Sequence, residues 1–218
     1  MTDKVENKTE EDLPEGAEVH HFEVDEDFTV KPPDGNHAFI SVWDNALEDE
    51  WCDKLIGMFD EQESLHQKTV HPEFRSFTEL NFFNPQLGSE FEEASMYLLG
   101  KVSEYVESYR RHNNIVFFPS QCHNEEVRMK KYVAGSEDDF KYHADVGDYA
   151  SARRFLVCFF YLNDVEEGGQ TAFPDYNTSI EAKKGRLAIF PPFWTHPHSG
   201  QPAISNDKYI VGTYLHYM

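Results

Sequence analysis

The sequence predicts a mostly β domain with N-terminal helices, an α+β class, and three observations indicate it. Short extended runs follow one another after residue 115 and are separated by turn residues, which is typical of a sandwich or barrel. Two earlier segments carry apolar residues at helical spacing, so both helices should back one sheet. The composition, 39% hydrophobic and 15% aromatic, favours a globular domain over a disordered chain.

The N-terminal residues 1–35 are expected to form a flexible acidic tail. Asp and Glu are frequent there, and almost nothing before Val24 is apolar, so the segment has little to bury. The run Pro32-Pro33-Asp34-Gly35 then interrupts the chain. We expect one folded domain over residues 36–218.

The helices and strands of that domain follow from local patterns. A strand is expected over residues 38–43, and Asn45 with Glu48 reads as the capping pair of a helix whose apolar stripe is Leu47, Trp51, Leu55, Met58 and Phe59. Ser89 with Glu92 should begin a second helix, with the stripe Phe91, Ala94, Leu98, Val102 and Tyr105/Val106. One or two strands are expected over residues 71–83, and seven more at 115–118, 127–133, 140–143, 155–162, 171–173, 186–190 and 209–214.

The charge and the cysteines limit the possible partners and compartment. Nineteen basic and forty acidic residues give a net charge of −21, which repels nucleic acid and attracts basic proteins or peptides. Cys52, Cys122 and Cys158 lack metal-ligand spacing and are odd in number, which favours free thiols in a reducing compartment. No apolar signal or membrane-spanning run is present. We therefore expect a cytoplasmic protein without a membrane or nucleic-acid partner.

The stretch from Tyr142 to His216 carries the candidate chemistry. His143 and Asp145 are two residues apart, so on an extended segment both side chains project from one face. A later histidine, either His196 or His198, would complete a set of two imidazoles and one carboxylate. Such a set binds non-haem Fe(II) on one side and leaves the other side open.

Five motifs in this stretch are similar to those of the 2-oxoglutarate- and Fe(II)-dependent oxygenases, and most closely resemble the prolyl 4-hydroxylase-like group. They are Tyr132 eleven residues before His143; His143-Ala144-Asp145; Arg154 seven residues before Tyr161-Leu162-Asn163; Gly168-Gly169-Gln170-Thr171; and His198 ten residues before Lys208. The resemblance implies a double-stranded β-helix, or jelly roll, with two supporting helices and a metal at its mouth. Only His198, and not His196, has the spacing to Lys208 that the family shows.

The resemblance also implies a role for each matching residue. His143, Asp145 and His198 would be the catalytic iron ligands. Lys208 would pair with the far carboxylate of 2-oxoglutarate, Tyr132 and Thr171 would help to hold it, and Tyr161 would line the same barrel. Arg154, Tyr214 and His216 would lie near the substrate.

The implied activity is hydroxylation of an unactivated carbon, with a prolyl residue of a peptide or protein as first choice. Its cofactors would be Fe(II), 2-oxoglutarate and O2, with ascorbate as a stimulant, and Asp145 favours hydroxylation over halogenation. Phe140 stands where the family often has a tyrosine, which weakens the case for proline, and the acidic residues 136–139 suit a basic peptide. A hydroxylase of a free amino acid or small molecule and a non-catalytic metal-binding jelly-roll module stay open as alternatives. The sequence leaves the oligomeric state undecided.

Overall fold

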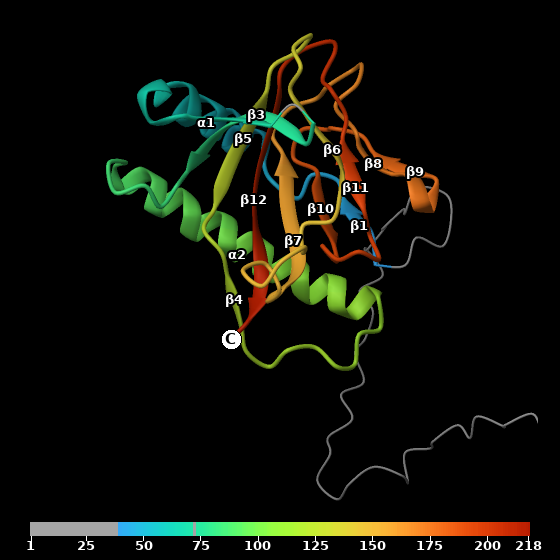
Figure 1. Cartoon of the computed structure of the whole chain (residues 1–218). Coiled ribbons are helices and arrows are strands. Elements are labelled where there is room, and N and C mark those ends of the chain that lie inside the picture. Colours follow the sequence, from blue (N-terminus) through green and yellow to red (C-terminus); the bar gives the residue numbers. More distant parts are fainter. Residues whose placement is uncertain (1–38, 72) are drawn as a thin grey trace, which may run out of the picture.

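Two helices lie across one face of a large antiparallel sheet in the computed structural model (Figure 1), which describes residues 39–71 and 73–218. The expected tail, residues 1–35, lies outside the described residues. The helices are α1 (Asp49–Asp60) and α2 (Ser89–His112), with short 3₁₀ turns η2 (Glu63–Leu65) and η3 (Pro174–Tyr176). The strands are β1 (Ser41–Trp43), β2 (Gln67–His71), β3 (Arg75–Asn81), β4 (Cys122–Asn124), β5 (Arg128–Tyr132), β6 (Asp139–His143), β7 (Arg154–Tyr161), β8 (Thr171–Phe173), β9 (Thr178–Ile180), β10 (Leu187–Phe190), β11 (His198–Gly200) and β12 (Lys208–Tyr217).

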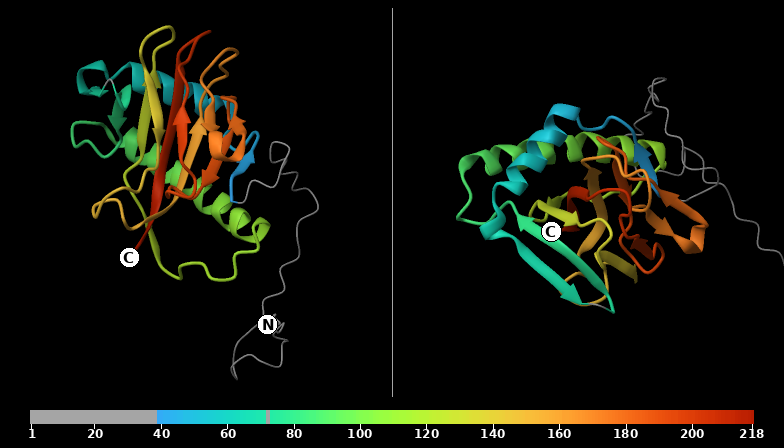
Figure 2. Two further views of the ribbon diagram at one scale, coloured as in Figure 1. Left: turned by 45° about the vertical axis from the view of Figure 1, so that its right-hand side comes forward. Right: turned by 90° about the horizontal axis from the view of Figure 1, so that it is seen from above.

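The strands form one continuous path that curves into a nearly closed barrel, as the jelly-roll expectation requires. Their order is β1-β10-β7-β12-β5-β3-β6-β11-β8-β9, with β2 added to β3 and β4 added to β12. Neighbours along this path are often far apart in sequence, as in a double-stranded β-helix. Seen from above (Figure 2, right), the helices lie along one side and the β2–β3 hairpin lies on another. The predicted fold class is confirmed.

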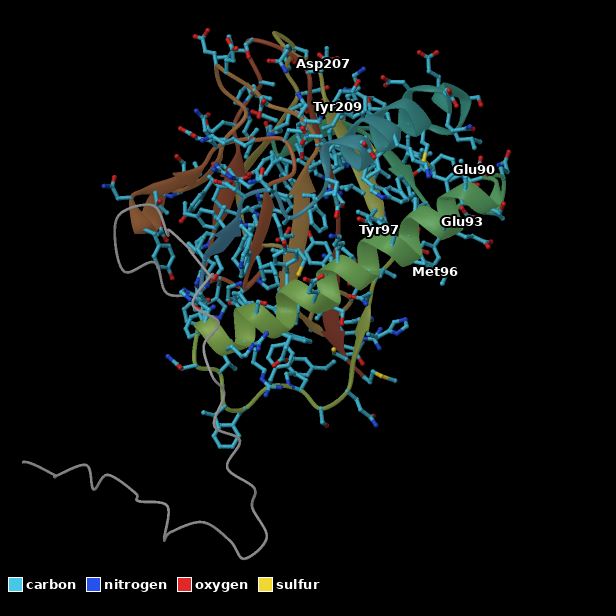
Figure 3. The ribbon with its side chains drawn as sticks, turned by 180° about the vertical axis from the view of Figure 1, so that it is seen from behind. Glu90, Glu93, Met96, Tyr97, Asp207 and Tyr209 are labelled. Carbon is cyan, nitrogen blue, oxygen red and sulfur yellow. The ribbon has the colours of Figure 1, made fainter. Side chains whose placement is uncertain are left out.

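The helices cover the sheet through the apolar stripes that the sequence predicted. Leu55 and Phe59 of α1 and Leu98 and Val102 of α2 are buried in one core cluster with Phe160 of β7. Burial of such side chains contributes roughly 1.5–3 kcal/mol each. The outer side of α2 carries Glu90, Glu93 and Met96, all exposed (Figure 3). The helices therefore support the barrel from outside and leave its interior to other side chains.

The start of α1 differs from the prediction. The N-cap residue is Glu48, whose side chain makes no capping hydrogen bond, and Asn45 has a left-handed backbone with φ 56°. The amide of Leu47 instead donates to the carbonyl of Gly185, 3.1 Å away. This hydrogen bond to a distant segment holds the chain where the helix begins. The prediction that Asn45 and Glu48 cap the helix is wrong. The second helix begins at Ser89, as predicted, but its N-cap is Gly88, so Ser89 does not cap it.

Several strand predictions also need correction. Residues 115–118 form no strand, and β4 begins only at Cys122, where it pairs with the end of β12. The short strands β9 and β11 had no predicted counterpart, because three residues carry too little periodicity to reveal a strand. Residues 71–83 contribute β3 and the end of β2.

Candidate active site

His143 and His198 are direct partners across the antiparallel pair β6 and β11. His143 ends β6 and His198 begins β11, so both imidazoles emerge where the two strands meet, and their ring centroids are 4.5 Å apart. Asp145 follows two residues after His143. Its Oδ1 lies 3.4 Å from His143 Nε2, and its Oδ2 lies 3.6 Å from His198 Nε2.

Backbone carbonyls orient both imidazoles. His143 Nδ1 lies 2.6 Å from the carbonyl of Lys141, and His198 Nδ1 lies 3.1 Å from that of His196. A protonated Nδ1 donating to a carbonyl leaves Nε2 as a lone-pair donor directed at Asp145, as is usual for metal-binding histidines. Burial lowers the pKa of His198 to about 4, so this imidazole is neutral at physiological pH, the form that binds metals.

The electrostatics and the unpaired atoms of this group fit a bound cation. Burial opposes ionisation of Asp145, but His143 and His198 outweigh it and hold the pKa of its carboxyl well below the usual range. His143 Nε2 and Asp145 Oδ2 are both buried without a hydrogen-bond partner. Such orphaned atoms are costly, and a metal ion would satisfy both. Within residues 39–71 and 73–218 this is the one group of three potential ligands that converges, with its ligand atoms within 4.8 Å of one another.

His196, the rival to His198, lies outside this group. Residues 193–196 form a turn in which the amide of His196 donates to the carbonyl of Phe193, 2.8 Å away. Alternation along an extended strand therefore does not apply to it. Its ring stacks on Tyr176, with centroids 5.2 Å apart, and its Nδ1 lies 2.9 Å from the hydroxyl of Thr195.

Lys208 is buried in the same cavity, with only 2% of its surface exposed. Its Nζ donates to the carbonyl of Gly169, 3.2 Å away, and lies 4.1 Å from the centroid of the Tyr132 ring. Among the described residues no carboxylate forms an ion pair with it, and burial lowers its pKa to about 7. A buried ammonium group without an anion is unfavourable, so this position fits a ligand carboxylate.

Tyr132 and Thr171 line the cavity near Lys208, and Tyr161 lies behind them. The hydroxyls of Tyr161 and Thr171 are 2.6 Å apart, and burial raises the pKa of Tyr161 above its usual range. Tyr161 is fully buried and is not part of the cavity lining. It therefore supports Thr171, while Thr171 faces the cavity.

Of the three predicted substrate-side residues, two line the cavity. Tyr214 donates a hydrogen bond of 2.9 Å to Asp145 Oδ1. The Arg154 guanidinium lies 4.0 Å from the centroid of the Tyr214 ring and binds both carboxylate oxygens of Glu125, at 2.7 and 2.8 Å. His216 lies outside the lining, and its ring is 5.6 Å from that of His123, its cross-strand partner on β4.

The acidic loop 136–139 does not contribute to the cavity lining. Asp138 is buried and accepts hydrogen bonds of 2.6 Å from Lys68 and 2.6 Å from Ser76. Asp139 is also buried and forms an ion pair with Lys141. Two of the acidic charges expected at the entrance are therefore neutralised elsewhere.

The sequence reasoning missed three cavity residues, Arg75, Lys130 and Glu125. Lys130 stands two residues before Tyr132 on β5, so strand periodicity alone predicts that both face the same way. Phe140 lies flat against His143, with ring centroids 3.5 Å apart and planes 11° apart. No local signal pairs Glu125 with Arg154, which is 29 residues away.

Fold and site together define a class of protein. A jelly roll with two histidines and one carboxylate, open on a cavity of about 570 Å³, is the arrangement of non-haem Fe(II) oxygenases. Residues 127–216 match the family model of the 2OG-Fe(II) oxygenase superfamily. Over these residues the chain is similar to this superfamily, and its relatives are prolyl hydroxylases.

Three relatives illustrate this likeness. The chain is 26% identical over 108 residues to prolyl 4-hydroxylase subunit alpha-1 of Gallus gallus, which covers 42% of this chain and 20% of the relative. It thus spans about a fifth of the length of that curated relative. A viral collagen prolyl hydroxylase from Paramecium bursaria Chlorella virus-1, in its 2OG complex, superposes with a TM-score of 0.64 at 22% identity, covering 84% of this chain and 98% of that one.

The third relative is a prolyl hydroxylase from Trichoplax adhaerens in complex with a hypoxia inducible factor oxygen degradation domain peptide fragment. It gives a TM-score of 0.65 at 15% identity and covers 83% of this chain and 84% of that chain. At these identities the two structures show the common fold. Among the described residues, no helix has the length and apolar character that crossing a membrane demands.

Proposed function

We propose that this chain is a 2-oxoglutarate- and Fe(II)-dependent dioxygenase that hydroxylates an unactivated C–H bond, with a prolyl residue of a peptide or protein as the target. One observation carries the proposal: a converging His143, Asp145 and His198 set shares its cavity with a buried, anion-free Lys208. The first feature suits a ferrous ion and the second suits a dicarboxylate cosubstrate. We also propose that residues 36–218 form a single oxygenase domain.

In this proposal His143, Asp145 and His198 hold the iron. When bound, iron, 2-oxoglutarate and O2 supply the oxidising chemistry, in which 2-oxoglutarate loses CO2 to become succinate and one oxygen atom enters the substrate C–H bond. Lys208 would pair with the far carboxylate of 2-oxoglutarate, and Tyr132 and Thr171 would hold its oxygens.

The chain's own groups would orient the reactants. Tyr214 fixes Oδ1 of Asp145 through its hydroxyl, which leaves Oδ2 for the metal. Arg154 and Tyr214 form the cavity wall next to this carboxylate, which supports a role on the substrate side. A peptide target is supported by the peptide complex of the Trichoplax adhaerens relative.

The test is succinate formation by the purified protein with Fe(II), ascorbate, O2 and 2-oxoglutarate, together with a mass gain of one oxygen on prolyl peptides. We expect turnover in the wild type and none in His143→Ala or Asp145→Ala variants that remain folded. Absence of succinate in the wild type would favour a non-catalytic metal-binding module. Oxygen gain on free amino acids, but not on peptides, would favour a small-molecule hydroxylase.

A further inference from the structure

The cavity lining holds as many carboxylates as cations, but the carboxylates are paired in a way that leaves two of the cations without a partner. Its acidic side chains outside the ligand set all have partners. Glu79 and Glu126 bind the two terminal nitrogens of Arg128, at 2.9 and 3.0 Å. Glu125 binds Arg154, and Asp148 accepts hydrogen bonds from the amide and the hydroxyl of Ser151.

Two cations of the lining have no such partner. Arg75 on β3 and Lys130 on β5 make no ion pair or side-chain hydrogen bond within the part of the chain that the structure describes, and Arg75 Nε is buried without an acceptor. Glu79 is the cross-strand neighbour of Lys130, but its carboxylate binds Arg128 instead. An unsatisfied buried donor is costly, so Arg75 favours an incoming anion, and Lys130 has no carboxylate with which it forms an ion pair among the described residues.

Arg75 and Lys130 converge on the same two aromatic rings. The Arg75 guanidinium lies 5.8 Å from the centroid of Phe77 and 5.6 Å from that of Phe140. Lys130 Nζ lies 4.7 Å and 5.9 Å from the same centroids. The planar guanidinium and the ammonium group together can donate hydrogen bonds to both oxygens of a carboxylate. The two aromatic rings supply the apolar surface beside them.

This pair is separate from Lys208. Lys130 and Tyr132 are two residues apart on β5, which separates them by roughly 7 Å along the strand, and Lys208 lies over the Tyr132 ring. Lys130 acts electrostatically on Asp145 and His198, whereas Lys208 responds to Asp139. Lys130 thus lies toward the ligand set, whereas Lys208 lies away from it.

We propose that Arg75 and Lys130 form a binding subsite for a carboxylate of the substrate. The inference rests on the proposed oxygenase function and deepens it, because it names an acidic substrate, either a peptide with Asp or Glu near its target residue or a small carboxylic acid. The overall charge of −21 suggests a basic substrate instead. The local arrangement argues otherwise, since the acidic loop contributes nothing to the cavity lining. The half-exposed ring of Phe74, 5.3 Å from Phe140, would cover the apolar part of such a substrate.

The experiment compares probes that differ only in one carboxylate. Capped prolyl peptides with Glu or Gln beside the proline test a side-chain carboxylate, and free proline against prolinamide tests a small acid. Binding is measured by calorimetry on the protein loaded with Mn(II) and N-oxalylglycine, so that it does not depend on turnover. We expect at least one carboxylate probe to bind roughly tenfold or more tightly than its uncharged partner.

Lys130→Met and Arg75→Gln should each remove this preference, and Lys130→Glu should shift it toward peptides that carry Lys beside the proline. Lys131→Met is the matched control, because Lys131 follows on the same strand but pairs with Asp60 and Asp207 outside the cavity. It should keep the preference. Thermal unfolding of each variant checks that it is folded.

Three outcomes would overturn the inference. The first is that carboxylate and uncharged probes bind equally well or not at all. The second is that Lys131→Met loses the preference as Lys130→Met does. The third is that the Arg75 and Lys130 variants keep the carboxylate preference but bind N-oxalylglycine more weakly. Succinate formation by the wild type reports separately on the proposed oxygenase. If the protein prefers carboxylate probes but forms no succinate, the oxygenase proposal fails and the subsite stands. If it forms succinate without such a preference, the subsite fails and the oxygenase proposal stands.

Discussion

The hydroxyl of Tyr214 donates a 2.9 Å hydrogen bond to Oδ1 of Asp145, from a strand 69 residues further along the chain. Asp145 follows β6, whereas Tyr214 lies in the middle of β12. The bond fixes the rotation of the carboxyl group and leaves Oδ2 as the unpaired oxygen. Tyr214 is thus a positioning residue for the candidate metal site.

Replacing Tyr214 with Phe should weaken metal binding, because the carboxylate then loses its fixed orientation. Loss of such an outer contact typically lowers metal affinity or activity by 10- to 100-fold, and we expect a decrease of roughly that size here. The measurement is a Mn(II) or Fe(II) titration of the purified variant. Tyr209→Phe is the control, since its hydroxyl also binds a carboxylate, that of Asp60, outside the cavity. Equal affinity in both variants would contradict the positioning role.

Divalent metal should stabilise the protein, since it satisfies the orphaned His143 Nε2 and Asp145 Oδ2. A ligand at 100 times its Kd stabilises the folded state by about 2.7 kcal/mol. For a domain of this size that raises Tm by roughly 5–10 °C. Thermal unfolding with and without Mn(II) measures the shift. A shift of the same size in Asp145→Ala would show that the ion binds elsewhere.

His198→Ala should lose bound iron, whereas His196→Ala should retain it. The physical reason is that only His198 lies beside Asp145, while His196 is held in a turn against Tyr176. Iron content after desalting, measured for both variants at equal protein concentration, decides between them. Retention in His198→Ala together with loss in His196→Ala would reverse the assignment.

Lys208→Met should raise the 2-oxoglutarate concentration needed for half-maximal turnover by roughly 10- to 100-fold, because a charge-assisted hydrogen bond is lost. Methionine keeps most of the volume and avoids a cavity. The control is 2-oxobutanoate, which lacks the far carboxylate. Wild type and variant should use it equally poorly, and an unchanged 2-oxoglutarate requirement would remove Lys208 from the cosubstrate site.

Binding of 2-oxoglutarate should take up a proton above neutral pH. Burial lowers the pKa of free Lys208 to about 7, so at about pH 8 most of the free protein carries the neutral amine. A bound carboxylate raises that pKa, and the complex is protonated. The affinity for 2-oxoglutarate should therefore fall as the pH rises above 7. Below pH 7 the free lysine is already protonated, so binding should take up no proton. Calorimetry in buffers of different ionisation enthalpy measures the uptake, and Lys208→Met should show none.

The sequence by itself determined the elements whose pattern is long or chemically specific. The stripes of both helices and the apolar run of β7 repeat often enough to predict their burial. His143-Ala144-Asp145 and the spacing of His198 to Lys208 predicted a set that the structure brings into one cavity. These signals are local, because each depends on residues within one helix or strand, or on a fixed number of residues between two positions of the chain.

Only the tertiary structure decided which groups from distant strands meet. The register of β6 against β11 brings His198 opposite His143, and the turn at residues 193–196 turns His196 away from them. The pairing of β3 with both β5 and β6 brings Arg75 and Lys130 over shared rings, while the nearby carboxylates are bound elsewhere. Strand register and ion-pair choice depend on packing across the whole barrel, so a linear pattern does not contain them.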